Sequence, residues 1–254
     1  MSLSPVAPLD PGAYTHRFYR NLVHPNRGFS FQVQEGESDL WIHTDKPRES
    51  HAQKVLHEVR KTLIQYINRD PSFKTSLRPL PLCSECPGIV QEMLHAAKIA
   101  EVGPMAGVAG MIAKAVGHAL IKDGAAHVLV ENGGDCFIYR PDSPTTLGLF
   151  AGQSPLSMKV GIKIPPNPEP VGAATSSGTV GPSLSFGKAD AVCVLSPDAT
   201  LADAAVTAIA NRIHSPEDLE SALTWGASLK GVNGIAAIVG EHLAAWGTVE
   251  LVKL

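Results

Sequence analysis

Asp203 and Thr207 are the two residues whose types and spacing point most directly to metal chemistry. They lie four residues apart in TLADAAVTAIAN, and in a helix this spacing places both side chains on one face. Mg²⁺ prefers oxygen ligands and usually keeps several waters or phosphate oxygens. By spacing alone a structural role is favoured, in which Thr207 bonds back to its own helix and Asp203 stabilises the helix N-terminus. The pair remains a candidate magnesium site.

A glycine pair after a predicted strand forms the second candidate site. The apolar run AHVLVEN is typical of a buried strand, and it leads into Asn132, Gly133, Gly134 and Asp135. Glycines let backbone N–H groups approach a ligand closely. A hairpin turn before the next strand, CFIY, would contain the same residues. The segment is therefore predicted either as a ligand-binding bend or as a plain turn or bulge.

The third candidate is a stretch rich in hydroxyl groups, GAATSSGTVG at residues 172–181. It has no large apolar side chain, which favours a loop. Hydroxyl groups and a glycine-rich backbone can form a concavity that binds anions, although the GxxxxGK[ST] spacing of a P-loop is missing. The candidate ligand-binding residues are Thr175, Ser176, Ser177, Gly178 and Thr179.

Lys114 and His118 lie four residues apart on a predicted helix of unusual composition, GPMAGVAGMIAKAVGHALI. Glycine and alanine at this density weaken an isolated helix, so we expect a neighbouring backbone or a ligand to approach it closely. His118 is then a candidate for proton transfer, and Lys114 is a candidate ligand-binding residue. The alternatives are tight packing for the helix and snorkelling to solvent for Lys114.

The four cysteines do not suggest a secreted scaffold held by disulfides, and we expect a reducing compartment. Cys83 and Cys86 form a CxxC just before Pro87 and a predicted helix, a position that can lower a thiol pKa and favour redox or sulfur-transfer chemistry. A structural or incidental role is the favoured alternative. A zinc site needs about four ligands, and no second CxxC is present. Cys136 and Cys193 are expected in the core.

These residues need elements to position them, and hydrophobic periodicity predicts an α+β arrangement of helices packed on antiparallel sheet. An early hairpin of FSFQVQ and DLWIHT should be covered by a helix over residues 49–69, which Asp70 and Pro71 stop. The other predicted elements are a helix from Pro87 to residue 100, the Gly/Ala helix over 104–121, strands in LGLFAG, LSMKVGIKI and DAVCVLS, helices over 200–213 and 216–227, and a terminal hairpin of VNGIAAIVG with GTVELVKL.

Composition favours a globular protein that binds small molecules. The 254 residues are expected to form one domain, 1–254, which includes a Pro-rich N-terminal leader over 1–14. The net charge is −3 and only 18% of residues are charged, so no basic surface is expected for nucleic acid or an anionic membrane. We find neither the pattern of a signal peptide nor a membrane-length apolar run. The expected location is the cytoplasm.

Taken in order, GMIAKAVGHA, LVENGGD, ATSSG and ADAAVTAIAN resemble the motifs of the ApbE-like superfamily, whose best-known members are magnesium-dependent flavin transferases that use FAD. The resemblance covers about residues 103–213. It is closest to a shorter, poorly characterised branch with the motifs GPMAxVAG, ENGGD, TSSGT and SFGKADAV. It implies two T-fold-like halves of antiparallel sheet and helices, with a site in a cleft between them.

The resemblance also implies roles for particular residues. Mg²⁺ would be bound by Asp203, Thr207 and the backbone carbonyl of Ala113. The segments from Asn132 to Asp135 and from Thr175 to Gly178 would line a pocket for FAD or FMN. Asp135 or His118 would transfer a proton during FAD cleavage or FMN transfer.

The sequence departs from the transferase pattern in three places. Ala115 stands where the motif has its second glycine, and Ala119 where it has an acidic residue. TVGPSLSFGKAD replaces a stretch that contains His-Asp-Pro. Two alternatives therefore stay open. One is a non-catalytic protein that binds a small ligand, and the other is a sulfur-handling protein that uses Cys83 and Cys86, as the association of some relatives with sulfur-amino-acid synthesis suggests. Oligomeric state is not predicted.

Overall fold

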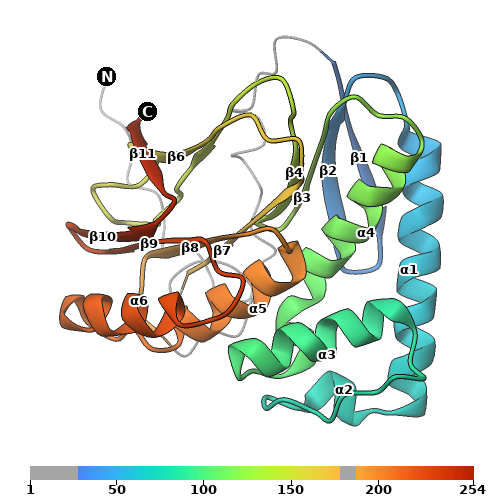
Figure 1. Cartoon of the computed structure of the whole chain (residues 1–254), viewed down its shortest axis with the longest axis horizontal. Coiled ribbons are helices and arrows are strands. Elements are labelled where there is room, and N and C mark those ends of the chain that lie inside the picture. Colours follow the sequence, from blue (N-terminus) through green and yellow to red (C-terminus); the bar gives the residue numbers. More distant parts are fainter. Residues whose placement is uncertain (1–27, 178–186) are drawn as a thin grey trace.

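The chain folds into helices packed on one face of a long antiparallel sheet, with a small sheet on part of the other face (Figure 1). The computed structural model describes residues 28–177 and 187–254. Within them, eight strands form one sheet in the order β1-β2-β3-β4-β7-β8-β9-β10, and three more form a second sheet in the order β11-β6-β5. Every pairing in both sheets is antiparallel. The predicted α+β class is confirmed.

The first half of the long sheet is a four-stranded unit with two main helices. Its elements are β1 (Phe29–Glu35), β2 (Ser38–Thr44), α1 (Glu49–Arg69), α4 (Val108–Lys122), β3 (Val128–Asn132) and β4 (Asp135–Tyr139). Between α1 and α4 come α2 (Ser72–Thr75), α3 (Gly88–Ala100) and the 3-10 turn η2 (Pro104–Gly107). The predicted early hairpin and the helix over 49–69 are confirmed. Pro87 is the N-cap of α3, so this helix begins at Gly88, one residue after the predicted start.

The second half repeats the order strand, strand, helix, helix, strand, strand. Its elements are β7 (Val171–Ser176), β8 (Ala191–Ser196), α5 (Ala199–Ala210), α6 (Leu219–Ala227), β9 (Gly234–Val239) and β10 (His242–Gly247), with the 3-10 turn η3 (Pro216–Asp218) before α6. The two halves join edge to edge, because β4 pairs with β7 through Cys136 and Ala173. The repeat agrees with the two T-fold-like halves implied by the resemblance.

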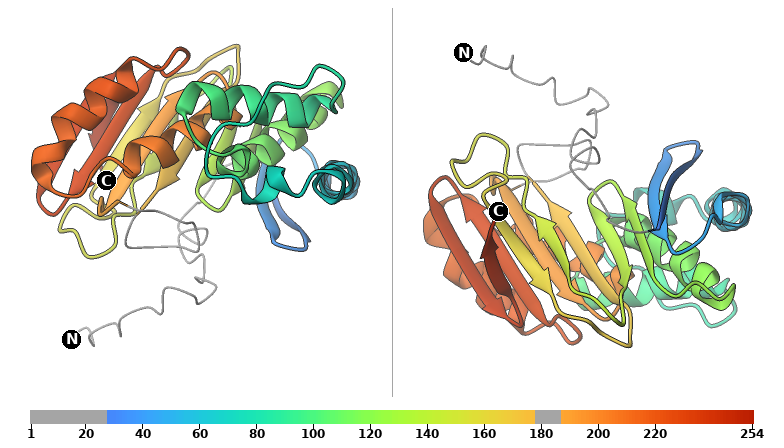
Figure 2. Two further views of the ribbon diagram at one scale, coloured as in Figure 1. Left: turned by 90° about the horizontal axis from the view of Figure 1, so that it is seen from below. Right: turned by 90° about the horizontal axis from the view of Figure 1, so that it is seen from above.

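The small sheet lies on the face of the long sheet opposite the helices (Figure 2). It consists of β5 (Thr145–Gly148), β6 (Val160–Ile164) and β11 (Glu250–Lys253). Strand alternation in β8 shows how the core is divided. Val192 and Val194 contact the helices of the second half, whereas Cys193 and Leu195 belong to the cluster under the small sheet. Cys136 and Cys193 are buried, as predicted.

The prediction of a loop at residues 172–181 is wrong for its first part. Residues 171–176 form β7, an inner strand that pairs with β4 and β8. A Cβ atom added at Gly172 would lie 2.4 Å from the Cα atom of Ala199, so α5 lies directly on this strand. The small side chains that suggested a loop are needed for this close approach.

The predicted terminal hairpin of VNGIAAIVG with GTVELVKL is also wrong. Gly240 has a φ of 59°, and the chain reverses there, directly after β9. The neighbouring segment HLAAWG therefore becomes β10 and pairs with β9. Strand β11 crosses to the small sheet, where it pairs with β6.

Helix α4 is tightly enclosed, which explains its glycine and alanine content. A Cβ atom at Gly110 would lie 2.1 Å from the carbonyl oxygen of Ala199, and one at Gly117 would lie 2.1 Å from the ring of Phe137. Residues Pro104–Lys122 have the length and apolar composition of a membrane-spanning helix, yet half of that segment is buried within the protein. Backbone and ring contacts of this kind identify a core helix.

Candidate functional site

Asp203 lies where α4 and α5 cross, at the junction between the halves. Its side chain is buried, with 8% of the residue exposed. Its Oδ2 atom accepts a hydrogen bond of 2.8 Å from the backbone N–H of Gly110. Burial raises the pKa of Asp203 to about 7, although backbone hydrogen bonds from Gly110 and Ala109 act in the opposite direction. The described residues, 28–177 and 187–254, contain no ion pair to this carboxylate.

Asn132 binds the same peptide group from the other side of the junction. Its Nδ2 atom donates a hydrogen bond of 3.1 Å to the carbonyl oxygen of Ala109, and Ala109 is joined to Gly110 by the peptide bond whose N–H binds Asp203. One peptide group at the start of α4 is thus held by a side chain from each half. The predicted glycine bend and Asp203 of the predicted metal pair therefore contact the same peptide group.

The glycine bend itself is a two-residue hairpin turn. Asn132 pairs with Asp135, and Gly133 and Gly134 have φ angles of 72° and 104°, as a type I′ turn requires. The N–H of Gly134 donates to Glu131 Oε1 at 2.8 Å. The prediction of a plain hairpin turn is therefore confirmed for the backbone. The N–H of Gly134 is already bonded to Glu131 and is not available to a ligand.

The end of β7 lies beside this turn. Thr175 Oγ1 donates a hydrogen bond of 2.9 Å to the carbonyl oxygen of Gly134, which fixes the two segments together. Strand alternation places Thr175 on the face of Ala173, under the small sheet, and Ser176 on the helix face. Ser176 and Ser177 are partly buried. Gly178 and Thr179, also predicted to bind ligand, lie outside the described residues.

Lys114 forms a bridge between the halves, one turn after Gly110 on α4. Its Nζ atom lies 2.9 Å from Glu92 Oε2 and 3.1 Å from Asp198 Oδ2, and its side chain is 19% exposed. Burial lowers the pKa of Lys114, but the two carboxylates outweigh it and the net shift is upward. Asp198 is the N-cap of α5 and accepts a hydrogen bond from the N–H of Thr200 at 2.9 Å. Lys114 is therefore paired within the protein and does not simply snorkel to solvent.

A hollow lies beside this ion pair, between α3 and α5. Its volume is about 350 Å³. Glu92 and Asp198, the two partners of Lys114, both line it, together with His95 and Gln91 of α3. The hollow is therefore adjacent to the junction and carries acidic and polar groups.

His118 lies about two helical turns after Gly110, the residue whose N–H binds Asp203. It follows Gly110 by eight residues, which corresponds to about 12 Å along a helix. The residue is exposed, and its ring contacts Phe137 edge-on with 4.9 Å between ring centroids. Partial burial of the ring, followed by the charge of Lys114, lowers the pKa of His118. Asp135 is closer to the junction, because it pairs directly with Asn132.

The proposed metal ligands differ in how well they fit a cation. Asp203 offers a buried carboxylate, and the partly buried Thr207 follows one turn later on α5. Ala113 is fully buried in the middle of α4, where its carbonyl oxygen is directed along the helix. In the part of the chain that the structure describes, no three His, Cys, Asp or Glu residues form a metal-binding group.

Cys83 and Cys86 form a disulfide and are therefore neither free thiols nor zinc ligands in this structure.

Two parts of the site were not predicted from the sequence. The Ala109–Gly110 peptide group contributes backbone atoms to the site. Asp203, which binds it, lies 93 residues from Gly110, and a contact to backbone atoms leaves no side-chain pattern in the sequence. Asp198 could have been found, because an aspartate just before a predicted helix is a common N-cap.

The family model described as "AbpE bacteria" matches residues 20–243. Among curated relatives, the "UPF0280 protein" of Methanocella arvoryzae is 39% identical over 216 residues, covering 85% of this chain and 87% of the relative. The "UPF0280 protein" of Methanothermobacter thermautotrophicus is 40% identical over 233 residues, covering 90% of each protein. These matches extend over nearly the whole chain.

Among solved structures, the flavinyl transferase ApbE of Pseudomonas stutzeri in its apo form matches with a TM-score of 0.56 and 13% identity, covering 87% of this chain and 95% of that one. The flavin transferase ApbE from Vibrio cholerae gives a TM-score of 0.56 and 11% identity, covering 87% and 97%. Identities this low show a shared fold alone. Together with the family model, they establish that the chain belongs to the family described as AbpE bacteria and has the ApbE fold.

Proposed function

We propose that this protein binds a phosphate-bearing flavin nucleotide, FAD or FMN, together with Mg²⁺ at the junction between its two halves. The observation that carries the proposal is the environment of Asp203. A buried carboxylate that is ionised needs a positive partner, and no side chain among the described residues forms an ion pair with it. The names of the structurally similar flavin transferases and the family membership support the choice of ligand.

Asp203 and Thr207 would hold the cation through a carboxylate and a hydroxyl oxygen. Bound Mg²⁺ would neutralise charge on the phosphates of the nucleotide. Ala113 would contribute only if its carbonyl accepts a second interaction besides the helical hydrogen bond, which the two lone pairs of a carbonyl oxygen permit. The remaining ligands would be water or phosphate oxygens, as is usual for Mg²⁺.

The other residues would position the nucleotide and move protons. Asn132 fixes the start of α4 against Asp203, and Ser176 and Ser177, at the end of β7, would contact the nucleotide beside the turn. Asp135 is the better candidate for proton transfer, because it lies across the turn from Asn132, whereas His118 is two helical turns away from Gly110. The proposed reaction is cleavage of FAD or transfer of its FMN part to an acceptor.

Incubation of the purified protein with FAD and MgCl₂, followed by chromatography of the products, tests the reaction. We expect release of AMP by the wild-type protein and its loss in D203N, whose amide can still accept the hydrogen bond from Gly110. The matched control is D142N, because Asp142 is an exposed carboxylate outside the junction. Absence of both turnover and flavin binding in the wild-type protein would rule out the proposal.

A non-catalytic binding protein is the second candidate function. It is favoured by Ala115 and Ala119, which stand where the transferase motif has a glycine and an acidic residue. This function predicts that FAD binds in the presence of Mg²⁺ and is recovered intact. Equilibrium dialysis followed by chromatography of the retained nucleotide separates the two functions.

A further inference from the structure

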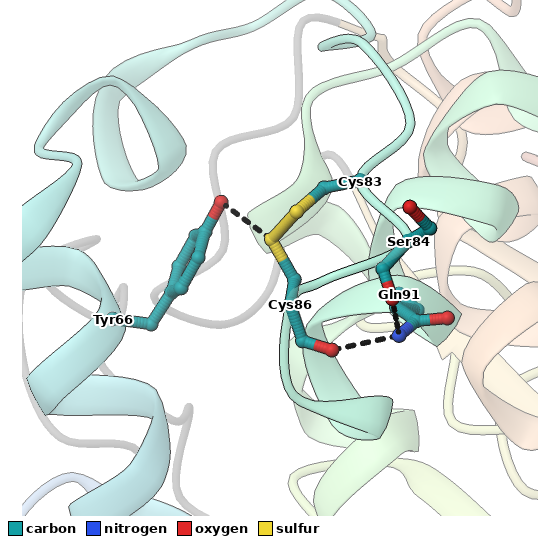
Figure 3. Close-up of a disulfide and its surroundings, with 5 residues drawn as sticks. All are labelled: Tyr66, Cys83, Ser84, Cys86 and Gln91. Atoms are coloured by element: carbon teal, nitrogen blue, oxygen red, sulfur yellow. Dashed lines mark hydrogen bonds between the residues drawn. A yellow bond between two sulfur atoms is a disulfide. The ribbon is translucent and has the colours of Figure 1, made fainter.

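The disulfide between Cys83 and Cys86 lies in the loop that precedes α3 (Figure 3). The two residues are separated by three positions, with Cα atoms 5.5 Å apart. Chain-entropy stabilisation by a disulfide decreases as the closed loop becomes shorter. A bridge across so few residues therefore adds little to the stability of the fold, and stability alone is a weak reason for its presence.

The loop is held in shape independently of the disulfide. Gln91, on the first turns of α3, donates hydrogen bonds from Nε2 to the carbonyl oxygens of Ser84 at 3.0 Å and Cys86 at 2.7 Å (Figure 3). These bonds involve backbone atoms, which do not change when the two sulfur atoms are reduced. We expect the pair to open and close without rearrangement of the loop.

The two sulfur atoms have different surroundings. The hydroxyl group of Tyr66, on α1, lies 3.3 Å from Cys86 Sγ and can donate a hydrogen bond to it. Cys86 also directly precedes Pro87, the N-cap of the 13-residue helix α3, and the N-terminus of a helix favours negative charge. Both features stabilise a thiolate on Cys86. Cys86 is therefore the better leaving group when the disulfide is attacked at Cys83.

Access from solvent is compatible with such an attack. Both cysteines are partly exposed, and Ser84 and Glu85 between them are exposed. Cys136 and Cys193, by contrast, are buried, and burial, followed by the charge of Asp135, raises the pKa of Cys193 to about 12. Only the CxxC pair combines access with stabilisation of a thiolate.

We propose that Cys83 and Cys86 are a redox-active pair that exchanges two electrons with external thiols, an activity separate from the proposed flavin site. A thiolate attacks Cys83 Sγ, the bond between the two cysteines breaks, and Cys86 leaves as a thiolate. A second thiolate attacks the external sulfur of the mixed disulfide, which releases Cys83 and an external disulfide. The two protons lost by the external thiols end on Cys83 and Cys86. Two thiols are thus oxidised to one disulfide while the protein disulfide is reduced, and the reverse sequence restores it.

The exchange is tested on the folded, full-length protein without flavin or Mg²⁺. One sample is equilibrated under anaerobic conditions with glutathione buffers, and another with reduced thioredoxin, so that small-molecule and protein thiols are distinguished. After quenching with acid and alkylation, peptide mass spectrometry should show Cys83 and Cys86 modified in at least one sample. If the disulfide resists both reductants and is reduced only after denaturation, the pair is structural and the proposal fails.

The predicted difference between the sulfur atoms gives a second test. In the reduced protein at neutral pH, limiting iodoacetamide should label Cys86 about tenfold faster than Cys83. Y66F should narrow this ratio because it removes the hydroxyl donor, whereas Y139F, a change on β4, should leave it unchanged. C86S should accumulate a mixed disulfide at Cys83 with oxidised glutathione, because no resolving thiolate remains. Equal labelling of the two cysteines, or no effect of Y66F, would contradict the assignment.

Discussion

The second hairpins of the two halves occupy corresponding places in the repeat but have different surroundings. The β3–β4 turn, at Gly133 and Gly134, adjoins the other half, and Thr175 donates a hydrogen bond to it. The β9–β10 turn, at Gly240, lies near the outer edge of the sheet, where Ser154 donates to its carbonyl oxygen and Asp190 accepts from its N–H. Both turns are held by hydrogen bonds. Of the two, the inner turn is the one preceded by a residue, Asn132, whose side chain binds the same peptide group as a side chain of the opposite half, that of Asp203. The position of a turn in the sheet, at the junction or at the outer edge, therefore decides which turn can serve a site.

The cores of the halves differ in a way that supports this geometry. The core of the first half contains large side chains such as Phe73, Leu56 and Met93. The core of the second half is rich in alanine, much of it on α5. Small side chains let α5 lie close to β7 and α4, and this close packing fixes Asp203 at the crossing. We therefore expect contacts at the junction to be more sensitive to substitution than equivalent contacts elsewhere.

The largest effect is expected for G110A. The added Cβ would meet the carbonyl oxygen of Ala199 at 2.1 Å and the Cβ of Asp203 at 2.9 Å, so the two helices must separate. We expect the free energy of unfolding, measured with urea, to fall by about 3 kcal/mol. The matched control is G88A on α3, where nothing lies within 4 Å of the added atom. A similar, small effect of both substitutions would contradict the tight junction.

A smaller loss is expected for N132A. It leaves the carbonyl oxygen of Ala109 without its side-chain donor, which should cost about 1–2 kcal/mol in urea unfolding. E241A, in the corresponding turn of the second half, removes an exposed side chain and should change stability little. Equal, small losses of unfolding free energy in N132A and E241A would show that the Asn132 hydrogen bond stabilises the fold no more than the exposed Glu241 side chain. That result would contradict the proposed difference between the two turns.

The smallest effect is a pH dependence from Lys114. Its folded-state pKa is raised above the ordinary 10.5, so its stabilising contribution is complete below that value and is lost as pH rises through the folded-state pKa. Compared with K114M, the wild-type protein should lose more stability as the solution becomes alkaline above pH 10.5. K163M is the control, because Lys163 pairs with Glu250 on the surface with 41% of its side chain exposed. Parallel pH profiles for wild type and K114M would show that the bridge to Asp198 is energetically unimportant.

The sequence allowed prediction of those elements that bury large side chains with regular spacing. The helix over 49–69 is an example, since Leu56 and Leu63 recur on its buried face. Strand β7 could not be predicted in this way, because its buried residues are glycine and alanine, whose packing depends on α5. Strand β10 was missed because its pairing depends on the tight turn at Gly240.

The candidate site was predictable to the same extent. Asp203 and Asn132 were identified by residue type and motif, and the structure brings them to one peptide group. His118 was selected from its place on the same helix as Lys114, and helical rise places it about two turns from Gly110. The contact of Asp203 with the Ala109–Gly110 peptide group depends on how α4 and α5 cross. These helices are far apart in the sequence, and residue spacing within either helix does not reveal the crossing.

Binding of Mg²⁺ to the wild-type protein and D203N tests the central claim most directly. Isothermal titration calorimetry would be carried out in the presence of FAD, with D142N as the control and urea unfolding to confirm that D203N is folded. The account predicts that D203N weakens Mg²⁺ binding by about tenfold or more, because the cation loses a charged ligand, while D142N binds like the wild type. Equal Mg²⁺ affinity for folded D203N and the wild-type protein would contradict the assignment of Asp203 as the metal ligand at the junction.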